Sequence, residues 1–165
     1  MNFYDVIKVR RSVRMYHPTP VSPDKLERIW EAVRWAPSAC NLQPWRFLIV
    51  KSDAMRARVS RYLQPWVMTA PLIIVGLGHR KLGWRRDGQS YHEVDVAIAF
   101  EHLVLAAAAE GLGTCWICAF DRQGMRLALN LDEDWDPVAV TPLGYPNDPS
   151  PRPPRKTIAD IVGEV

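Results

Sequence analysis

Arginine and hydroxyl side chains alternate in the N-terminal run Arg10-Arg11-Ser12-Val13-Arg14. In an extended segment Arg10, Ser12 and Arg14 point to one face, because successive side chains alternate between faces. Two guanidinium groups and a hydroxyl around one volume suit a phosphate dianion, which accepts several charge-assisted hydrogen bonds at once. Arg11 faces the other way and can meet another part of the same ligand or a carboxylate. A solvated basic surface explains this motif alone equally well.

A stiffened polar loop is expected in the sequence PSACNLQP, which begins at Pro37. Its two prolines restrict the backbone, while Ser38, Asn41 and Gln43 offer short polar groups. Loops of this kind on a rigid scaffold often bind ligands. The alternative is a helix stop followed by a turn, with serine and asparagine acting as caps. The motif alone favours that alternative.

Two cysteines with C-x-x-C spacing occur in the segment GLGTCWICAFD, residues 111–121, which follows a long apolar stretch. Its GLG does not match a dinucleotide-binding loop, which follows a strand and contains more glycines. In the strand expected at 114–120, Cys115 and Cys118 face opposite sides, because positions three apart do so. We therefore expect neither a disulfide nor a shared metal there.

A third basic group lies in the proline-rich tail GYPNDPSPRPPRK, residues 144–156. Proline makes this stretch extended and non-helical. Arg152, Arg155 and Lys156 can return to the anion that the N-terminal arginines bind. A solubilising tail is the equally simple alternative.

No other spacing predicts a metal site or a catalytic side chain. The histidines, at positions 17, 79, 92 and 102, lack ligand spacing, and no G-x-S-x-G elbow is present. The acidic run at 132–136 is more typical of a solvated loop than of a metal site. We therefore predict no bound metal, and the lack of an acid–base pair favours a cofactor that carries the chemistry.

The composition is that of a globular chain, with 165 residues of which 48% are hydrophobic and 24% charged. No apolar run approaches the ~18 to 20 residues of a membrane span, and the charged N-terminus is unlike a signal peptide. Three cysteines are too few for a disulfide scaffold, which favours a reducing cytoplasm. Nucleic-acid binding through the arginines is a weak alternative, because the net charge is only +3 and no base-reading module is present.

The elements that must position these residues alternate along the chain. Periodicity and caps predict helices at 2–8, 23–36, 53–63, 91–111 and 121–130, strands at 45–50, 71–78, 114–120 and 138–146, and a short tail element at 157–162. Residues 79–90 are expected to form a polar loop. The order predicts one α+β domain over residues 1–165, with a central mixed or antiparallel sheet covered by helices. Seven tryptophans and the apolar helix exceed what one small core needs, which suggests a dimer.

Together these motifs resemble the nitroreductase family of flavin enzymes, and in the same order along nearly the whole chain. RRSVR resembles the family's phosphate and ribityl motif, and PSACNLQPW is similar to its P-S-x-x-N-x-Q-P-W motif. EGLGTCWICAFD resembles the end of its central helix and the flavin-facing strand, and LGYPNDPSPRPPRK its G-Y-P turn and basic tail. The chain departs from larger members by lacking most of a helical insertion that shapes the substrate pocket. Cys118 also stands where an acidic residue is common, so only a backbone role transfers to that position.

The resemblance implies a nitroreductase-like fold, an intertwined homodimer, and one FMN in each of two sites at the dimer interface. The residues so implied are Arg10, Arg11, Ser12, Arg14, Arg155 and Lys156 around the phosphate and ribityl chain, Ser38, Asn41 and Gln43 from the partner subunit, and Trp116, Ile117, Cys118 and Ala119 along the isoalloxazine ring. The backbone N–H of Cys118 or Ala119 would donate to the flavin N5.

The activity so implied is ping-pong transfer of hydride from NADH or NADPH through FMN to an electron-poor small molecule, such as a nitroaromatic or a quinone. The alternative is a carrier or sensor that holds FMN without substantial turnover. Neither reading assigns a role to a nucleic acid or a membrane.

Overall fold

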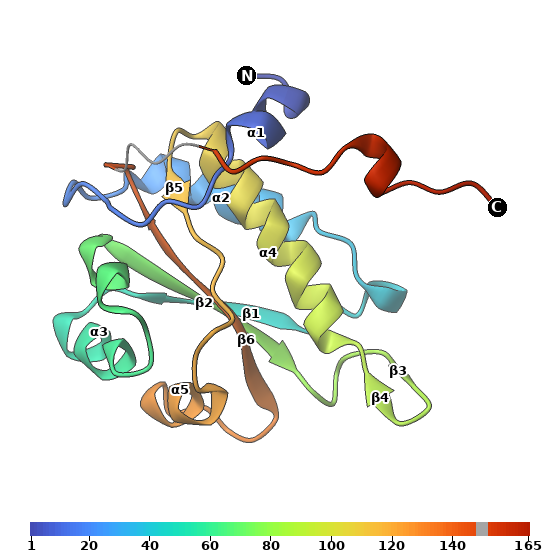
Figure 1. The fold of residues 1–165 in the computed structure, drawn as a ribbon. Coiled ribbons are helices and arrows are strands. Elements are labelled where there is room, and N and C mark those ends of the chain that lie inside the picture. Colours follow the sequence, from blue (N-terminus) through green and yellow to red (C-terminus); the bar gives the residue numbers. More distant parts are fainter. Residues whose placement is uncertain (148–151) are drawn as a thin grey trace.

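The computed structural model describes residues 1–147 and 152–165, and its centre is an antiparallel sheet (Figure 1). The strands are β1 (Trp45–Val50), β2 (Leu72–His79), β5 (Gly113–Thr114) and β6 (Trp135–Gly144), in the order β1-β2-β6-β5. The helices are α1 (Phe3–Val9), α2 (Pro23–Arg34), α3 (Asp53–Ser60), α4 (His92–Ala109) and α5 (Arg122–Ala128), with 3₁₀ turns η1 (Ala39–Asn41), η2 (Pro65–Thr69) and η3 (Ile158–Asp160). This α+β architecture confirms the predicted fold class. Within the described residues, no helix is both long and apolar enough to cross a bilayer.

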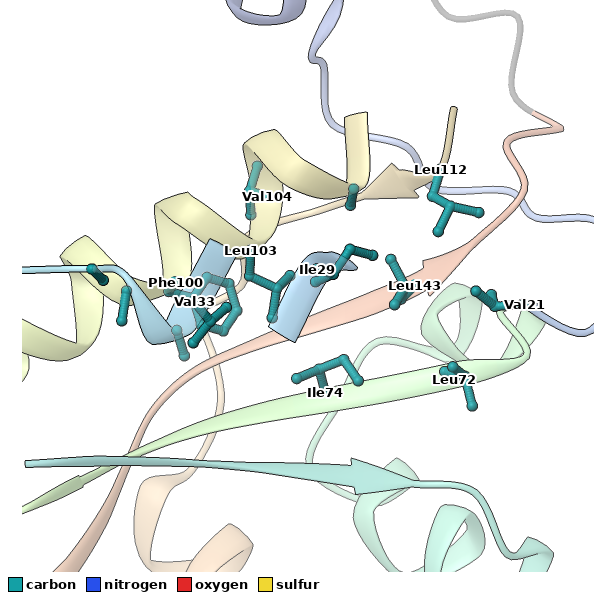
Figure 2. Packing of buried hydrophobic residues seen from close by; sticks show 14 residues of the cluster. Val21, Ile29, Val33, Leu72, Ile74, Phe100, Leu103, Val104, Leu112 and Leu143 are labelled. Atoms are coloured by element: carbon teal, nitrogen blue, oxygen red, sulfur yellow. The ribbon is translucent and has the colours of Figure 1, made fainter. Parts of the chain in front are cut away.

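Helix α4 is the main helix of the layer on one face of the sheet. Together with α2 it covers one face of the sheet, where Phe100 and Leu103 of α4 pack with Ile29 of α2 and Ile74 of β2 (Figure 2). The helix can approach the sheet closely because Gly76 of β2 has no side chain: a Cβ there would lie 2.8 Å from the Phe100 ring.

The opposite face of the sheet carries a second core. Because side chains alternate along a strand, Ile73 and Val75 of β2 point to this face, where they join Val59 of α3 and Met125 of α5. The molecule is therefore layered as helices, sheet and helices (Figure 1). The loops and the N-terminal arm, residues 10–17, surround this layered core.

Most helix boundaries follow the predicted signals. Ser22 is the N-cap of α2 with Pro23 at its first position, and the Asp121 side chain accepts from the Gln123 N–H to begin α5. Gly111 follows α4 with a φ of 74°, a conformation that glycine adopts without strain.

The predicted strand at 114–120 is wrong beyond Thr114. The ladder between β5 and β6 covers two residue pairs, and only an isolated bridge between Ile117 and Val140 follows. The intervening Cys115 N–H donates to the side-chain oxygen of Thr141 (3.0 Å) instead of to a backbone carbonyl. A side-chain acceptor therefore breaks the ladder, and residues 115–120 run as irregular chain along β6.

The expected loop at 79–90 contains a small hairpin, β3 (Arg85–Arg86) and β4 (Gln89–Ser90). Its turn is Asp87-Gly88, and both residues have positive φ, at 50° and 81°. Asp-Gly is the dipeptide that favours such two-residue turns. The Asp87-Gly88 pair is therefore the sequence signal for this hairpin.

Candidate functional site

The N-terminal arm and the C-terminal tail meet at one cavity of about 550 Å³. Its lining consists of basic, hydroxyl and proline residues from both segments: Arg10, Arg11, Ser12, Arg14, Arg152, Pro153, Pro154 and Arg155. Charge-assisted donors from segments far apart in sequence thus surround a single volume. Lys156, which was expected to join them, is exposed and does not line this cavity.

The arm is held against β5 and the end of β6. Ser12 bridges Thr114, and the Val13 N–H donates to the Thr114 carbonyl at 2.8 Å. Tyr16 is buried, and its hydroxyl donates to the Val13 carbonyl at 2.6 Å. These contacts fix the backbone from which the arm's basic side chains project.

Arg11 lines the same cavity as Arg10 and Arg14, although the extended pattern placed it on the opposite face of the segment. It lines the 550 Å³ cavity and also a neighbouring one of about 230 Å³, which is lined mainly by apolar residues such as Val13 and Leu112. The reason is that the arm makes only single bridges with the sheet and is not a regular strand. Strict alternation of faces therefore does not hold.

Glu101 of α4 lies within electrostatic range of Arg10. Burial raises the pKa of Glu101, and the nearby charges of Arg10 and His102 oppose that rise. The surroundings of Arg10 are therefore not uniformly positive, because α4 places the acidic Glu101 beside it.

The loop at residues 37–44 lies at the opposite end of α4. Its Ser38 hydroxyl accepts from the Gln43 N–H at 2.9 Å, and the Gln43 amide donates to the backbone and side-chain oxygens of Asn41, both at 3.2 Å. The Ala39 N–H donates to Asp95 in the first turn of α4 at 2.9 Å. Serine therefore acts as a turn acceptor, as the simpler interpretation held, but the loop also presents exposed Asn41 and Gln43.

The two groups of residues are widely separated within one chain (Figure 1). Arg10 and Arg11 share a cavity with Ala108 near the C-terminal end of α4, whereas the loop contacts Asp95 near its N-terminal end. At a rise of about 1.5 Å per residue, these two positions on α4 are roughly 20 Å apart. The described residues of one chain therefore do not gather all of the predicted site around a single phosphate-sized volume.

The third predicted segment, residues 116–119, runs between these regions. Trp116 packs on Phe100 of α4 with ring centroids 4.6 Å apart, and Ile117 is buried. Cys118 and Ala119 are exposed. Within residues 1–147 and 152–165, the backbone N–H groups of Cys118 and Ala119 have no acceptor, so this turn offers two donors to a ligand.

A charged cavity of about 620 Å³ lies beside α5 and was not predicted. Asp136, expected in a solvated loop, is only 3% exposed and accepts from Arg80 and Arg122, each at 3.2 Å. Burial opposes ionisation, but the hydrogen bond from His92 and the two arginines outweigh it, so the pKa of Asp136 is lowered. A buried hydrophobic run directly after Asp136 was the signal that could have placed it at the start of a strand.

His92, Glu93 and Asp136 bring one ligand atom each within 4.8 Å of one another. Arg122 donates to both Glu93 and Asp136, at 2.8 and 3.2 Å. The carboxylate oxygens that a cation would need are thus already paired with a guanidinium group. The geometry is that of an ion-pair cluster joining α4, α5 and β6.

Several known proteins resemble this chain in sequence and in fold. The model of the nitroreductase family matches residues 7–64 and 54–145. The structure of a nitroreductase family protein from Clostridium novyi is 35% identical, has a TM-score of 0.84, and is aligned over 90% of this chain and 87% of that one. Another from Clostridium difficile is 29% identical, with a TM-score of 0.91 over 99% and 98%. An NADH dehydrogenase of Thermus thermophilus is 31% identical over 83% of each chain.

Other similar proteins carry different names. An iodotyrosine deiodinase of Thermotoga neapolitana is 26% identical over 94% of each chain, and a 5,6-dimethylbenzimidazole synthase of Rhodospirillum rubrum is 29% identical over 87% of this chain and 82% of its own. A structure from Exiguobacterium sibiricum in complex with FMN shares the fold, with a TM-score of 0.88 at 22% identity. Proteins similar in sequence to this chain are therefore named for quite different reactions.

Proposed function

Because this chain belongs to the nitroreductase family, we propose that it is an FMN-dependent oxidoreductase. In this proposal NADH or NADPH is the electron donor, and an electron-poor small molecule such as a nitroaromatic or a quinone is the acceptor. Family membership supports the general class of oxidoreductase. FMN, when bound, supplies a ring that accepts a hydride from one substrate and passes it to another in a ping-pong cycle.

The observation that carries the proposal is the cavity shared by the N-terminal arm and the tail. A phosphate monoester accepts several charge-assisted hydrogen bonds, and this cavity is lined by the arginines of both segments and by Ser12. The donor set therefore fits the phosphate of a mononucleotide. In the proposal Arg10, Ser12, Arg14 and Arg155 hold the phosphate and ribityl chain, with Arg11 beside them.

Lys156 remains in the proposal as a tail residue that can turn toward the bound anion, since its side chain is long and exposed. For the ring, we assign the segment Trp116 to Ala119. The N–H groups of Cys118 and Ala119 are the protein donors suited to N5, where negative charge accumulates on reduction. Trp116 and Ile117 anchor that segment through their packing.

We further propose that two copies of the chain complete each site. Ser38, Asn41 and Gln43 lie near the opposite end of α4 from the arginine cavity, so a partner subunit is the natural source of these groups. Exposed apolar side chains at both termini, including Phe3, Tyr4 and Ile158, are consistent with an interface between copies. A homodimer with two composite sites follows.

We also propose that the enzyme acts in the cytoplasm. The described cysteines are free, which suits the cytoplasm. We treat residues 1–165 as one domain that acts on small molecules and has no nucleic-acid or membrane partner.

The absorption spectrum of the purified protein tests the proposal directly. We expect flavin bands in the isolated protein or after addition of FMN, and anaerobic NADH or NADPH should bleach them. A colourless protein that takes up no added FMN would refute the proposal. A flavin-loaded protein that neither donor bleaches would instead be a carrier or sensor.

A further inference from the structure

A carboxylate is buried in the first turn of helix α4. Asp95 is 2% exposed, and its Oδ1 accepts from the Ala39 N–H at 2.9 Å. Within residues 1–147 and 152–165, its Oδ2 has no hydrogen-bond partner. A desolvated carboxylate with one oxygen unpaired costs free energy. Its place in the fold therefore points to a role other than stability.

The loop that Asp95 contacts has a strained backbone. Three non-glycine residues within four positions, Cys40, Asn41 and Gln43, have positive φ values of 50°, 55° and 48°. Asparagine tolerates this conformation, but cysteine and glutamine rarely adopt it. Such residues persist only where their surroundings hold them in place.

The hydrogen bonds that hold this loop involve mainly its first residues, Ser38 and Ala39. The Asn41 N–H donates to the Ser38 carbonyl and the Leu42 N–H to the Ala39 carbonyl, at 3.0 and 3.1 Å. These bonds lie within the loop itself and move with it. Among the hydrogen bonds that residues 38–43 make within the described part of the chain, the bond from Ala39 to Asp95 is the one that joins the loop to a helix of the core.

We propose that Asp95 is a positioning residue that anchors the strained 38–43 loop to α4, so that Asn41 and Gln43 are presented in one conformation. The inference rests on the proposed function, in which this loop completes the flavin site of the partner subunit. Asp95 also lies in the first turn of α4, where the helix dipole favours a negative charge and offsets part of the cost of burial. A charged acceptor holds the amide more strongly than a neutral one.

The test compares two variants at Asp95 with one control. Asp95→Ala removes the acceptor, and Asp95→Asn keeps a carbonyl oxygen at the same position. Glu93→Gln is the matched control, because Glu93 is also acidic and in the first turn of α4 but is exposed and contacts Arg122 rather than the loop. Two quantities are measured: amide hydrogen exchange of the peptide covering residues 38–43, and the dissociation constant of FMN.

We expect Asp95→Ala to speed exchange in the loop about tenfold and to weaken FMN binding by a similar factor, which corresponds to one lost charge-assisted hydrogen bond. Its melting temperature should fall no more than that of Glu93→Gln, because a costly buried charge is removed along with the bond. Asp95→Asn should stay within about threefold of the wild type in both measurements, since its carbonyl oxygen can still accept. Rescue by asparagine would show that a neutral acceptor is sufficient, but aspartate and asparagine have nearly the same volume, so Asp95→Leu, which fills the space without an acceptor, separates the hydrogen bond from the filling of space.

Unchanged exchange in Asp95→Ala would overturn the inference. If the wild type binds no FMN at all, the proposed function fails, and the exchange data alone still decide whether Asp95 anchors the loop. Should Asp95→Ala not fold, Asp95→Leu serves in its place, because leucine favours helix and fills the space without an acceptor. Faster loop exchange is expected there too, and equal exchange would count against the anchor.

Discussion

Arg10 and Arg155 come from near opposite ends of the chain, yet they line one cavity. Like charges held close together repel, and this repulsion is relieved when an anion binds between them. Arginine is suited to the task because its planar fork can make two parallel hydrogen bonds to a phosphate. At the scale of single residues, the cavity is therefore the part of the molecule in which side-chain chemistry most directly indicates a ligand.

Replacing Arg10 tests the phosphate assignment. We expect Arg10→Ala to weaken FMN binding about 10- to 100-fold, because a charge-assisted hydrogen bond to the phosphate is lost. FMN titration by fluorescence measures this change, and circular dichroism checks that the fold is retained. The control is Arg86→Ala, an exposed arginine of the β3–β4 hairpin outside this cavity. Full FMN occupancy in Arg10→Ala would show that the phosphate lies elsewhere.

Cys118 tests whether its backbone or its side chain matters. Its thiol is exposed and accepts from the Trp116 indole N–H at 3.1 Å. We assign only the backbone N–H to flavin binding, so Cys118→Ser should retain NAD(P)H-dependent activity within about twofold, as expected for an exposed substitution. Steady-state assays on the flavin-loaded variant measure this. Loss of activity with fold and flavin retained would assign a role to the thiol.

At the scale of elements, Asp136 joins three parts of the fold. It is the second residue of the long strand β6 and accepts from His92 at the start of α4 and from Arg122 at the start of α5. Arg80, directly after β2, is its third partner. The ion pairs and hydrogen bonds of Asp136 therefore join strand β6 to the starts of α4 and α5 and to the end of β2. They add to the two apolar cores on the faces of the sheet.

We expect Asp136→Asn to lower the free energy of unfolding at pH 7 by about 2 kcal/mol. Breaking a buried pair costs more than this, but Arg80 and Arg122 are 53% and 40% exposed, so solvent screens their share. Urea unfolding gives the measurement. Glu133→Gln is the control, since it removes the same charge from an exposed neighbour. If Asp136→Asn were as stable as Glu133→Gln, the ion pairs of Asp136 would not stabilise the fold.

The effect of Asp136→Asn on the free energy of unfolding should depend on pH. Because the pKa of Asp136 is lowered in the folded state, its contribution is fully present above the ordinary aspartate pKa of about 3.9 and is lost as pH falls through the lower folded value. The stability difference between wild type and Asp136→Asn should therefore shrink from pH 7 to pH 3. A difference that stays constant over this range would show that the effect is not electrostatic.

At the scale of the whole molecule, the two halves of the proposed site lie near opposite ends of α4. A helix is rigid over this length, so no small movement of one chain brings its own 37–44 loop to its own arginine cavity. We therefore propose a symmetric dimer, in which a two-fold axis places the loop of each copy beside the cavity of the other.

Mixed dimers test this arrangement. Arg10→Ala and Asn41→Ala should each impair both sites of a homodimer. In a mixed dimer of the two, isolated with two different tags, one site contains both changes and the other contains neither. We therefore expect about half of wild-type activity in the mixed dimer. If each site were built from one chain, the mixed dimer would be as impaired as the two parent variants.

The sequence by itself determined the local structure and the kinds of side chain that are available to bind a ligand. Hydrophobic periodicity with caps such as Ser22-Pro23 and Asp121 located the main helices, and buried runs located β1, β2 and β6. These features depend on neighbours a few residues away, so they can be recognised from the sequence. The arginines and the PSACNLQP loop were recognised in the same way, by residue type and spacing.

Only the tertiary structure decided which of these groups meet. The irregular path of residues 115–120 depends on the Thr141 side chain, and the burial of Asp136 depends on Arg80 and Arg122. The sequence of α4 assigns no role to Asp95, and only the fold places the Ala39 N–H against its side chain. Each of these contacts joins residues far apart in sequence, and no local pattern encodes a distance in space.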